Sequence, residues 1–292
     1  MYFFRKIILK FLKSFRKSLL SGITPRLLSP PDLAAKEVFT DLEKAENNPT
    51  KVYQLSLNNL GLKEVPTFIW DLKRLQSLDL SYNKLESIPE EIGNLKNLQF
   101  LKIEVNRLKV IPKAIGNLKN LKTLELDSNH ISIITERICK LKKLEKLAIS
   151  DNQLIHLTAE LGKVETLREL YLSGNQLRSL PDELCRLINL QRVEITGNQI
   201  SQLPELIGNL ENLIILRASN NQLTSLPDSI GLLQKLRELI LNNNRLLKLP
   251  DSIYELPHIT IVKLWDNYFP DKEKMKILHN FKSIECYVYP EK

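Results

Sequence analysis

The chain has 292 residues, of which 43% are hydrophobic and 26% are charged, a composition typical of a folded protein with a large core. Only nine Gly are present, which argues against Gly-rich nucleotide-binding folds. The net charge of +8 is uneven, because residues 1–30 contain seven Lys or Arg and no acid, whereas the remainder carries 35 basic and 34 acidic residues. We therefore expect no nucleic-acid partner, since the near-neutral body has no basic stripe to hold phosphates.

The first 20 residues, MYFFRKIILKFLKSFRKSLL, combine apolar and cationic side chains at helical spacing. The predicted membrane-contacting residues are the apolar Phe3, Phe4, Ile7, Ile8 and Phe11 and the cationic Arg5, Lys6, Lys10 and Lys13. This pattern is typical of a helix lying in an anionic membrane interface. The apolar runs are too short for a secretory signal. Residues 1–29 are predicted to be a basic amphipathic segment, and docking on another protein, targeting or a disordered tail remain alternatives.

The next segment, residues 30–51, carries the signals of a helix that covers the start of a larger domain. Pro30 and Pro31 precede Asp32, apolar residues follow, and Asn47-Asn48-Pro49 forms a stop. We expect one N-terminal capping helix here.

Residues 52–269 repeat with a period of 23. The aligned residues are Val52, Leu75, Leu98, Leu121, Leu144, Leu167, Leu190, Leu213, Leu236 and Ile259. Positions 4 and 6 of each interval are apolar between mostly polar neighbours, which indicates a strand. One repeat cannot bury its own leucines, but stacked copies can. The 23-residue pattern therefore predicts an α/β solenoid of about ten repeats. Its concave face should carry a curved parallel β-sheet, and its convex face should carry turns and short helical segments.

Each interval restates L-x-x-L-x-L-x-x-N-x-L-x-x-L-P-x-x-I-x-x-L-x-x, most clearly from Leu167 to Asn189. The pattern resembles the leucine-rich repeat family, in particular the 23-residue LPxxIxxL class found in many bacterial proteins and in plant intracellular Ras-group-related proteins. The resemblance implies a non-enzymatic scaffold that binds a protein partner through its concave face, with a small GTPase or kinase pathway component as one partner class. The alternative is a secreted or surface-attached bacterial binding or adhesion protein.

The residues at two positions of the repeat are expected to have structural roles. The Asn at position 9 is expected to satisfy backbone groups in the turn after the strand, as a buried ladder. The Leu-Pro step is expected to fix the convex turn, and Thr135 and Thr158 replace this proline in repeats four and five. We expect less rigid convex turns there.

No pattern in the chain predicts catalysis, a cofactor or a metal site. A GxxxxGK phosphate loop is absent, and the four His occupy unrelated repeat positions. Cys139, Cys185 and Cys286 are odd in number and have no paired spacing, which indicates a reducing compartment. We expect a cytoplasmic protein, held peripherally at a membrane by residues 1–20.

Positions 3, 5 and 7 should face the concave side, because positions 4 and 6 point inward. Asp79, Lys102 and Glu125 are expected to form one charge ladder and Lys146, Glu169 and Arg192 another, while Glu104 and Asp127 join Glu125 in an acidic spot. The candidate partner-binding residues are Ile215, Arg217, Ile240, Ile261, Lys263, Trp265 and Tyr171, with a second aromatic pair of Phe100 and Tyr82. Contiguous exposed apolar groups and a Trp near an Arg are typical of contact sites.

Residues 270–292 are expected to form the C-terminal cap. Pro270 and Asp271 begin a predicted short helix that runs to about Leu278. Ile284, Cys286 and Val288 then alternate like a last truncated strand. Alternatively, this segment folds back over the apolar concave residues of the last repeats.

Overall fold

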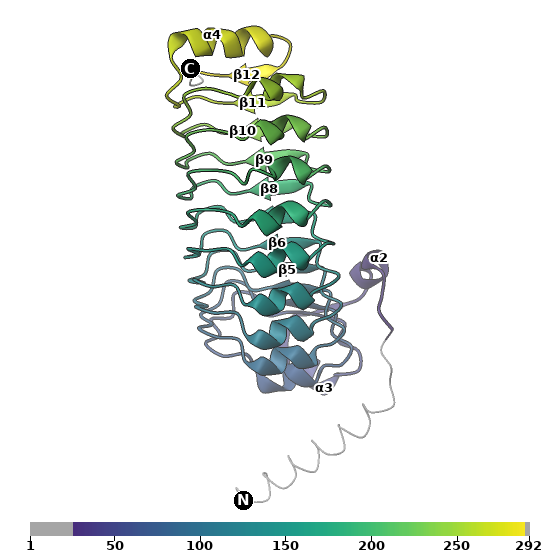
Figure 1. Cartoon of the computed structure of the whole chain (residues 1–292). Helices are drawn as coiled ribbons and strands as arrows, with labels where there is room; N and C mark the ends of the chain where they lie inside the picture. Colours follow the sequence, from purple (N-terminus) through teal and green to yellow (C-terminus); the bar gives the residue numbers. More distant parts are fainter. Residues whose placement is uncertain (1–25, 290–292) are drawn as a thin grey trace, which may run out of the picture.

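The computed structural model describes residues 26–289. The predicted amphipathic helix of residues 1–20 lies outside this range. The described chain forms one 12-stranded sheet in which the strands follow in chain order from β1 to β12, and each pairs with its neighbours in parallel. Figure 1 shows the strands stacked as rungs of an open solenoid, with short helices along its other face.

The ten central strands each span three residues and recur at 23-residue intervals. They are β2 Gln54–Ser56, β3 Ser77–Asp79, β4 Phe100–Lys102, β5 Thr123–Glu125, β6 Lys146–Ala148, β7 Glu169–Tyr171, β8 Arg192–Glu194, β9 Ile215–Arg217, β10 Glu238–Ile240 and β11 Ile261–Lys263. The middle residue of each strand is position 4, and it is buried in all ten. Positions 3 and 5 therefore point away from the core, as period-2 geometry requires.

The convex face carries one short 3₁₀-helix for each of nine repeats among the described residues. They are η1 Thr67–Asp71, η2 Glu90–Asn94, η3 Lys113–Asn117, η4 Glu136–Lys140, η5 Ala159–Lys163, η6 Asp182–Arg186, η7 Ile207–Asn209, η8 Asp228–Leu232 and η9 Asp251–Glu255. Between sheet and helices, the leucine and isoleucine rows of successive repeats form one continuous buried cluster. The predicted α/β leucine-rich repeat solenoid is confirmed.

The position-9 asparagines form the predicted ladder. Asn152 is 7% exposed. Its Oδ1 accepts the Ile131 N–H at 2.9 Å, and its Nδ2 donates to the carbonyls of Leu126 and Ser150 at 3.0 and 2.9 Å. Because one amide satisfies backbone groups of its own repeat and of the repeat before it, the side chain links consecutive turns.

The two repeats without proline follow the same convex path as the others. Thr135 and Thr158 have φ of −63° and −67°, and each hydroxyl oxygen accepts the N–H two residues later at 3.3 Å. The prolines at this position include Pro66 and Pro89, with φ of −55° and −74°. A hydroxyl cap thus takes the place of the ring, and the sequence change does not alter the turn.

The N-terminal cap differs from the single helix that we predicted. Helix α2 (Pro30–Ala34) and helix α3 (Leu42–Asn47) are separated by the strand β1 (Val38–Phe39). Strand β1 pairs with β2 in parallel, and Phe39 is buried. The prediction of one helix over residues 30–51 is therefore wrong, because the first repeat offers an open strand edge that β1 covers.

The C-terminal cap is as predicted. Helix α4 (Asp271–Asn280) closes the last repeat (Figure 1), and strand β12 (Glu285–Tyr287) continues the sheet beside β11. Since β12 extends the sheet in register, this segment prolongs the concave face. Burial raises the pKa of Cys286 to about 11, which fits a thiol packed against the core.

Candidate binding surface

Positions 3 and 5 of the strands form two parallel columns on the concave face. The strands pair in register, so each residue lies opposite its equivalent in the next repeat, as Ser77 lies opposite Phe100 and Asp79 opposite Lys102. Neighbouring rungs of a sheet are about 4.8 Å apart. Side chains from three or four successive repeats can therefore contact one ligand together.

Glu125 on β5 is the most buried charge on this face, with 5% of its surface exposed. Its carboxylate lies 2.6 Å from Lys102 Nζ and 2.6 Å from Lys146 Nζ. Burial alone would raise the pKa of Glu125, but the two lysines outweigh burial and leave the pKa below its ordinary value. The predicted ladder is confirmed between Lys102 and Glu125, and the second lysine comes from the other column.

Asp127 lies next to this pair at position 7. Burial, the largest cause, and the charges of Glu104 and Glu125 raise the pKa of Asp127 to about 6, although the Ser150 N–H donates to its carboxylate at 2.5 Å. Burial and the neighbouring acids Glu104 and Glu125 thus favour the protonated form of Asp127.

Tyr171 on β7 is fixed by charged neighbours in the middle of the sheet. Its hydroxyl donates to Glu169 Oε2 at 2.8 Å, and Lys146 Nζ lies 5.3 Å from its ring centroid. Burial, followed by the hydrogen bond to Glu169, raises the pKa of Tyr171 to about 12. Glu169 thus bonds to Tyr171, so the predicted Lys146–Glu169–Arg192 ladder is replaced by other contacts.

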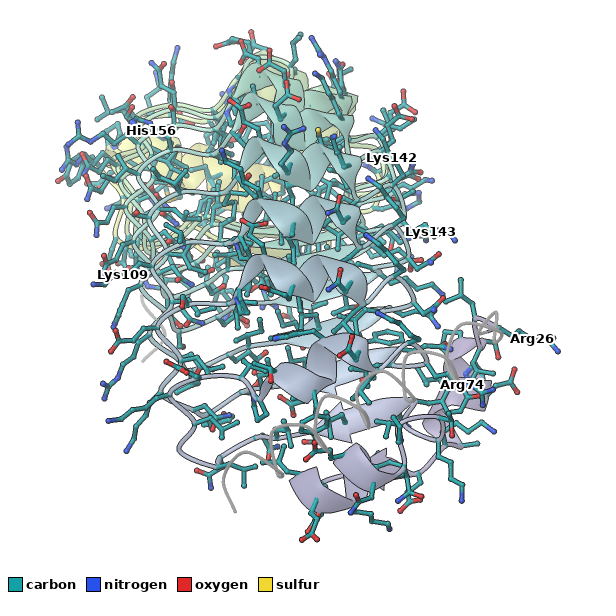
Figure 2. All side chains as sticks on the ribbon, turned by 90° about the horizontal axis from the view of Figure 1, so that it is seen from below. Arg26, Arg74, Lys109, Lys142, Lys143 and His156 are labelled. Carbon is teal, nitrogen blue, oxygen red and sulfur yellow. The ribbon has the colours of Figure 1, made fainter. Side chains whose placement is uncertain are left out.

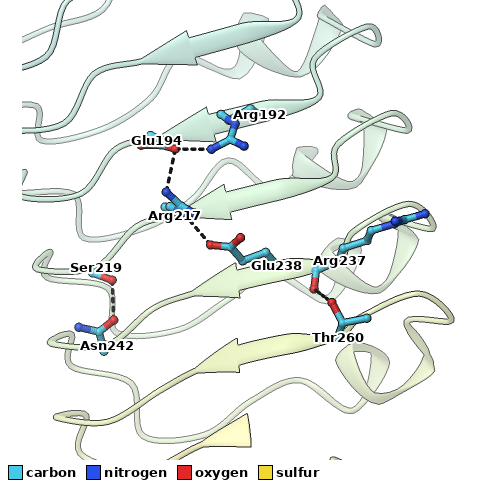
Figure 3. A network of polar contacts seen from close by, with 8 residues as sticks. All are labelled: Arg192, Glu194, Arg217, Ser219, Arg237, Glu238, Asn242 and Thr260. Atoms are coloured by element: carbon cyan, nitrogen blue, oxygen red, sulfur yellow. Dashed lines mark hydrogen bonds and ion pairs between the residues drawn. The ribbon is translucent and has the colours of Figure 1, made fainter. Parts of the chain in front are cut away.

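Arg192 belongs instead to an ion-pair chain across β8, β9 and β10 (Figure 3). Arg192 lies 2.8 Å from Glu194, Glu194 lies 3.2 Å from Arg217, and Arg217 lies 2.6 Å from Glu238. The central member, Arg217, is shared by two carboxylates. Arg192 and Glu194 lie on the same strand and Glu194 lies directly opposite Arg217, whereas Arg217 reaches diagonally to Glu238 in the other column.

The C-terminal end of the concave face holds a cation between two aromatic rings. Lys263 Nζ lies 5.4 Å from the Trp265 ring centroid and 5.1 Å from the Tyr287 ring centroid, within the range of cation–π attraction. Tyr287 was not among the predicted residues. It lies opposite Lys263 because β12 continues the register, and the alternation of Ile284, Cys286 and Val288 could have indicated its outward position.

The three isoleucines of the predicted patch are half-buried and interleaved with charges. Ile215 and Ile261 share one column with Glu238 between them, whereas Ile240 lies between Arg217 and Lys263 in the other. On this surface, therefore, aliphatic side chains alternate with charged ones.

The two residues of the second predicted aromatic pair occupy different positions of their repeats. Phe100 is half-buried at position 3 on β4, whereas Tyr82 is 56% exposed at position 8, in the turn after β3. Their role in binding stays a prediction.

Within residues 26–289, no three His, Cys, Asp or Glu side chains gather in a way that could hold a metal ion. No helix in this range is long and apolar enough to cross a membrane. Burial raises the pKa of the Cys185 thiol to about 11, which keeps this thiol protonated.

Comparison with known proteins identifies related folds. The chain is similar to the plant peptide hormone receptor RGFR1 in complex with RGF2, at 30% identity and a TM-score of 0.69, over 81% of this chain and 38% of that chain. A leucine-rich repeat protein of Leptospira interrogans matches at 25% identity and 0.51, over 86% and 99%. An internalin, inlF, of Listeria monocytogenes matches at 22% identity and 0.76, over 89% and 75%. No curated protein matches by sequence.

Three family profiles match the chain itself. They are a leucine-rich repeat region over residues 50–157, leucine-rich repeats in two copies over residues 165–208, and a leucine-rich repeat over residues 235–256. Together with the stacked parallel strands and the asparagine ladder, these matches show that the chain belongs to the leucine-rich repeat proteins.

Proposed function

We propose that the protein is a non-enzymatic scaffold whose concave face binds a protein or peptide partner. The proposal is carried by the outward-facing residues of strands β7 to β12. There, Tyr171, Trp265 and Tyr287 lie on the same face of the sheet as the ion-pair chain, and the inward residues of the sheet are fixed by packing. Aromatic and Arg side chains of this kind are frequent anchors in protein interfaces. A similar solenoid, the plant receptor RGFR1, is found in complex with RGF2, which supports the same use of the fold here.

The mixed character of the surface suggests the chemistry of the ligand. Ile215, Ile240 and Ile261 offer apolar contact, while Arg217 and Glu238 fix the orientation of a polar chain by complementary charge. A peptide or protein segment that presents both apolar and charged side chains toward the sheet would match this surface.

Trp265 provides the direct test. The full chain is used to capture a partner, and the purified partner is then titrated against wild-type protein and two variants. Trp265→Ala should weaken binding by about 2 kcal/mol or more, as truncation of a central aromatic anchor does, and should change the unfolding free energy by less than about 1 kcal/mol. Leu232→Ala, on the convex face and 60% exposed, is the matched control and should bind as wild type. A large stability loss with retained affinity would make Trp265 a cap residue.

The proposal includes a cytoplasmic location, with residues 1–20 attached to an anionic membrane and a small GTPase or kinase pathway component as one partner class. The three free cysteines support a reducing compartment. The alternative is a secreted or surface-attached binding protein. Cell fractionation distinguishes the two, because cytosol plus inner membrane supports the first and medium or outer surface supports the second.

A further inference from the structure

A band of cations runs along one edge of the solenoid, where the chain leaves each 3₁₀-helix and approaches the next strand. Position 22 is lysine in the first four repeats, and Arg or Lys also occupies nearby positions. We call the set the cationic flank: Lys73, Arg74, Lys96, Lys119, Lys122, Lys140, Lys142 and Lys143. Figure 2 shows Arg74, Lys142 and Lys143 along one side of the molecule, and Lys109 and His156 on the opposite side.

These cations have few acidic partners. Among the described residues, one member of the flank forms an ion pair: Lys73 Nζ lies 4.0 Å from Asp71 Oδ1. Lys119 donates to the Gly116 carbonyl at 2.7 Å, and Lys143 donates to the Asn120 side chain at 2.8 Å. Burial and then the charges of Lys140, Lys96 and Lys142 lower the pKa of Lys119. The flank is thus a surface of mutually repelling charge that an anionic partner would relieve.

The fold does not require lysine at these places. The same position 22 is Glu165, Ile188, Glu211 and Gln234 in repeats five to eight, with the solenoid unchanged. Residues 52–143 carry fifteen basic and ten acidic residues, whereas residues 144–269 carry twelve and fifteen. The sequence-based expectation of a body without a basic stripe is therefore wrong, because the folded chain gathers charges that lie 23 residues apart.

The N-terminal chain is clamped to the same edge. Gln76 and Gln99, at position 2 of repeats two and three, are 0% and 2% exposed. Gln76 Oε1 accepts the Leu28 N–H at 2.9 Å and its Nε2 donates to the Arg26 carbonyl at 3.0 Å, while Gln99 Nε2 donates to the Leu28 carbonyl at 2.9 Å. Residues 1–25, with six of their own cations, are therefore joined to the solenoid beside the cationic flank.

We propose that the cationic flank contacts an anionic lipid surface, so that the solenoid lies on its edge and its concave face stays open to a partner. The charge complementarity favours an anionic surface, and the apolar residues that precede Arg26, including Phe3, Phe4 and Phe11, favour lipid over nucleic acid, because a phosphate backbone would leave them in water. This inference goes beyond recognition by the concave face and stands without it.

The test is co-sedimentation of the full-length chain with phosphatidylcholine vesicles that contain or lack phosphatidylserine. The flank variant is Lys96→Glu with Lys142→Glu and Lys143→Glu. Its matched control is Arg107→Glu with Lys109→Glu and Arg178→Glu, which changes the net charge equally at exposed positions of the opposite edge. Both variants retain residues 1–20.

Wild type should bind phosphatidylserine vesicles far better than neutral ones, and added salt should weaken the binding. Each cation removed from the surface should cost about fivefold in affinity, so the flank variant should lose about 100-fold or more and the control much less. Equal losses in the two variants, or a flank variant that binds as wild type, would overturn the proposal. A flank variant that loses duplex DNA binding and keeps lipid binding would overturn it in favour of nucleic acid.

Folding is checked by thermal melting of all proteins. If the charge reversals prove unstable, Lys96→Gln, Lys142→Gln and Lys143→Gln provide a milder series, which removes three cations without adding acids and should lose about 100-fold. Failure of the flank leaves the concave-face proposal intact, because the Trp265 titration uses no lipid.

Discussion

The inward and outward positions of the same strands differ in what they tolerate. In β9, Leu216 is fully buried, and its equivalents in the other central strands are Leu or Val. Its neighbours Ile215 and Arg217 face the concave side, where the same columns hold Glu, Lys, Tyr or Ser in other repeats. The inward residues that determine the fold therefore recur in every repeat. The outward residues that determine the surface differ from one repeat to the next.

This difference has an energetic basis. Removing an inward group leaves a cavity or an unsatisfied buried polar group, and neither can be hydrated easily. An outward side chain that is removed leaves a site that water fills. Stability measurements on matched inward and outward substitutions should therefore separate the two classes.

The largest effect is expected for Asn152→Ala. The change leaves the Ile131 N–H and the Leu126 and Ser150 carbonyls without their partner, so the unfolding free energy should fall by about 1–3 kcal/mol, with or without ligand. Urea unfolding measures it. Asn189→Ala is the control, because this exposed amide makes one hydrogen bond, to the Glu165 carbonyl, and should cost clearly less. An unchanged Asn152→Ala protein would contradict a structural ladder.

A gain of stability is expected for Asp127→Asn. The pKa of Asp127 is raised from 3.8 to about 6, so the folded state binds the proton more tightly and ionisation costs stability as the pH rises from about 4 to above 6. Because the group is partly exposed, solvent screening reduces the effect to about 1 kcal/mol at pH 7.5. Melting at several pH values measures it, and the gain should vanish near pH 4.

Asp151→Asn is the control for this gain. Asp151 is exposed at position 8, where other repeats carry Asn59, Asn220 and Asn243 with the same positive φ. The amide should be accommodated there with little change in stability, because Asn already occupies this backbone conformation in those repeats. A similar gain in both variants would mean that overall charge, and not the burial of Asp127, is responsible.

The same division explains what the sequence could predict. The strands and the asparagine ladder follow from the repeated pattern, and the C-terminal cap follows from local helix and strand signals after the last repeat; the structure contains all three. The N-terminal cap does not follow, because Val38 and Phe39 fit a helical stripe locally. They form a strand because the edge of β2 needs hydrogen-bond partners, which no local pattern records.

Contacts between outward side chains were also harder to predict. Register places Glu194 directly opposite Arg217, yet Arg217 also reaches diagonally to Glu238, and Lys146 reaches diagonally to Glu125. Long side chains span such diagonals, so their partners depend on rotamers that the sequence does not fix. The clamp of Gln76 and Gln99 on residues 26–28 depends on a chain passage that follows from no repeat.

The smallest effect is expected at the end of the ion-pair chain. Arg192→Gln removes a cation whose acid, Glu194, keeps Arg217 as a partner, so no carboxylate is left alone and the unfolding free energy should change by less than about 0.5 kcal/mol. Arg217→Gln is the informative comparison, because Glu238, with 17% of its side chain exposed, then loses its cation. An acid left unpaired at this burial should cost about 1 kcal/mol. Urea unfolding of both variants and of the double variant gives the coupling directly. Equal losses for the two single variants would mean that the chain acts as one cooperative unit, and the concave face would then share the structural role assigned here to the inward positions.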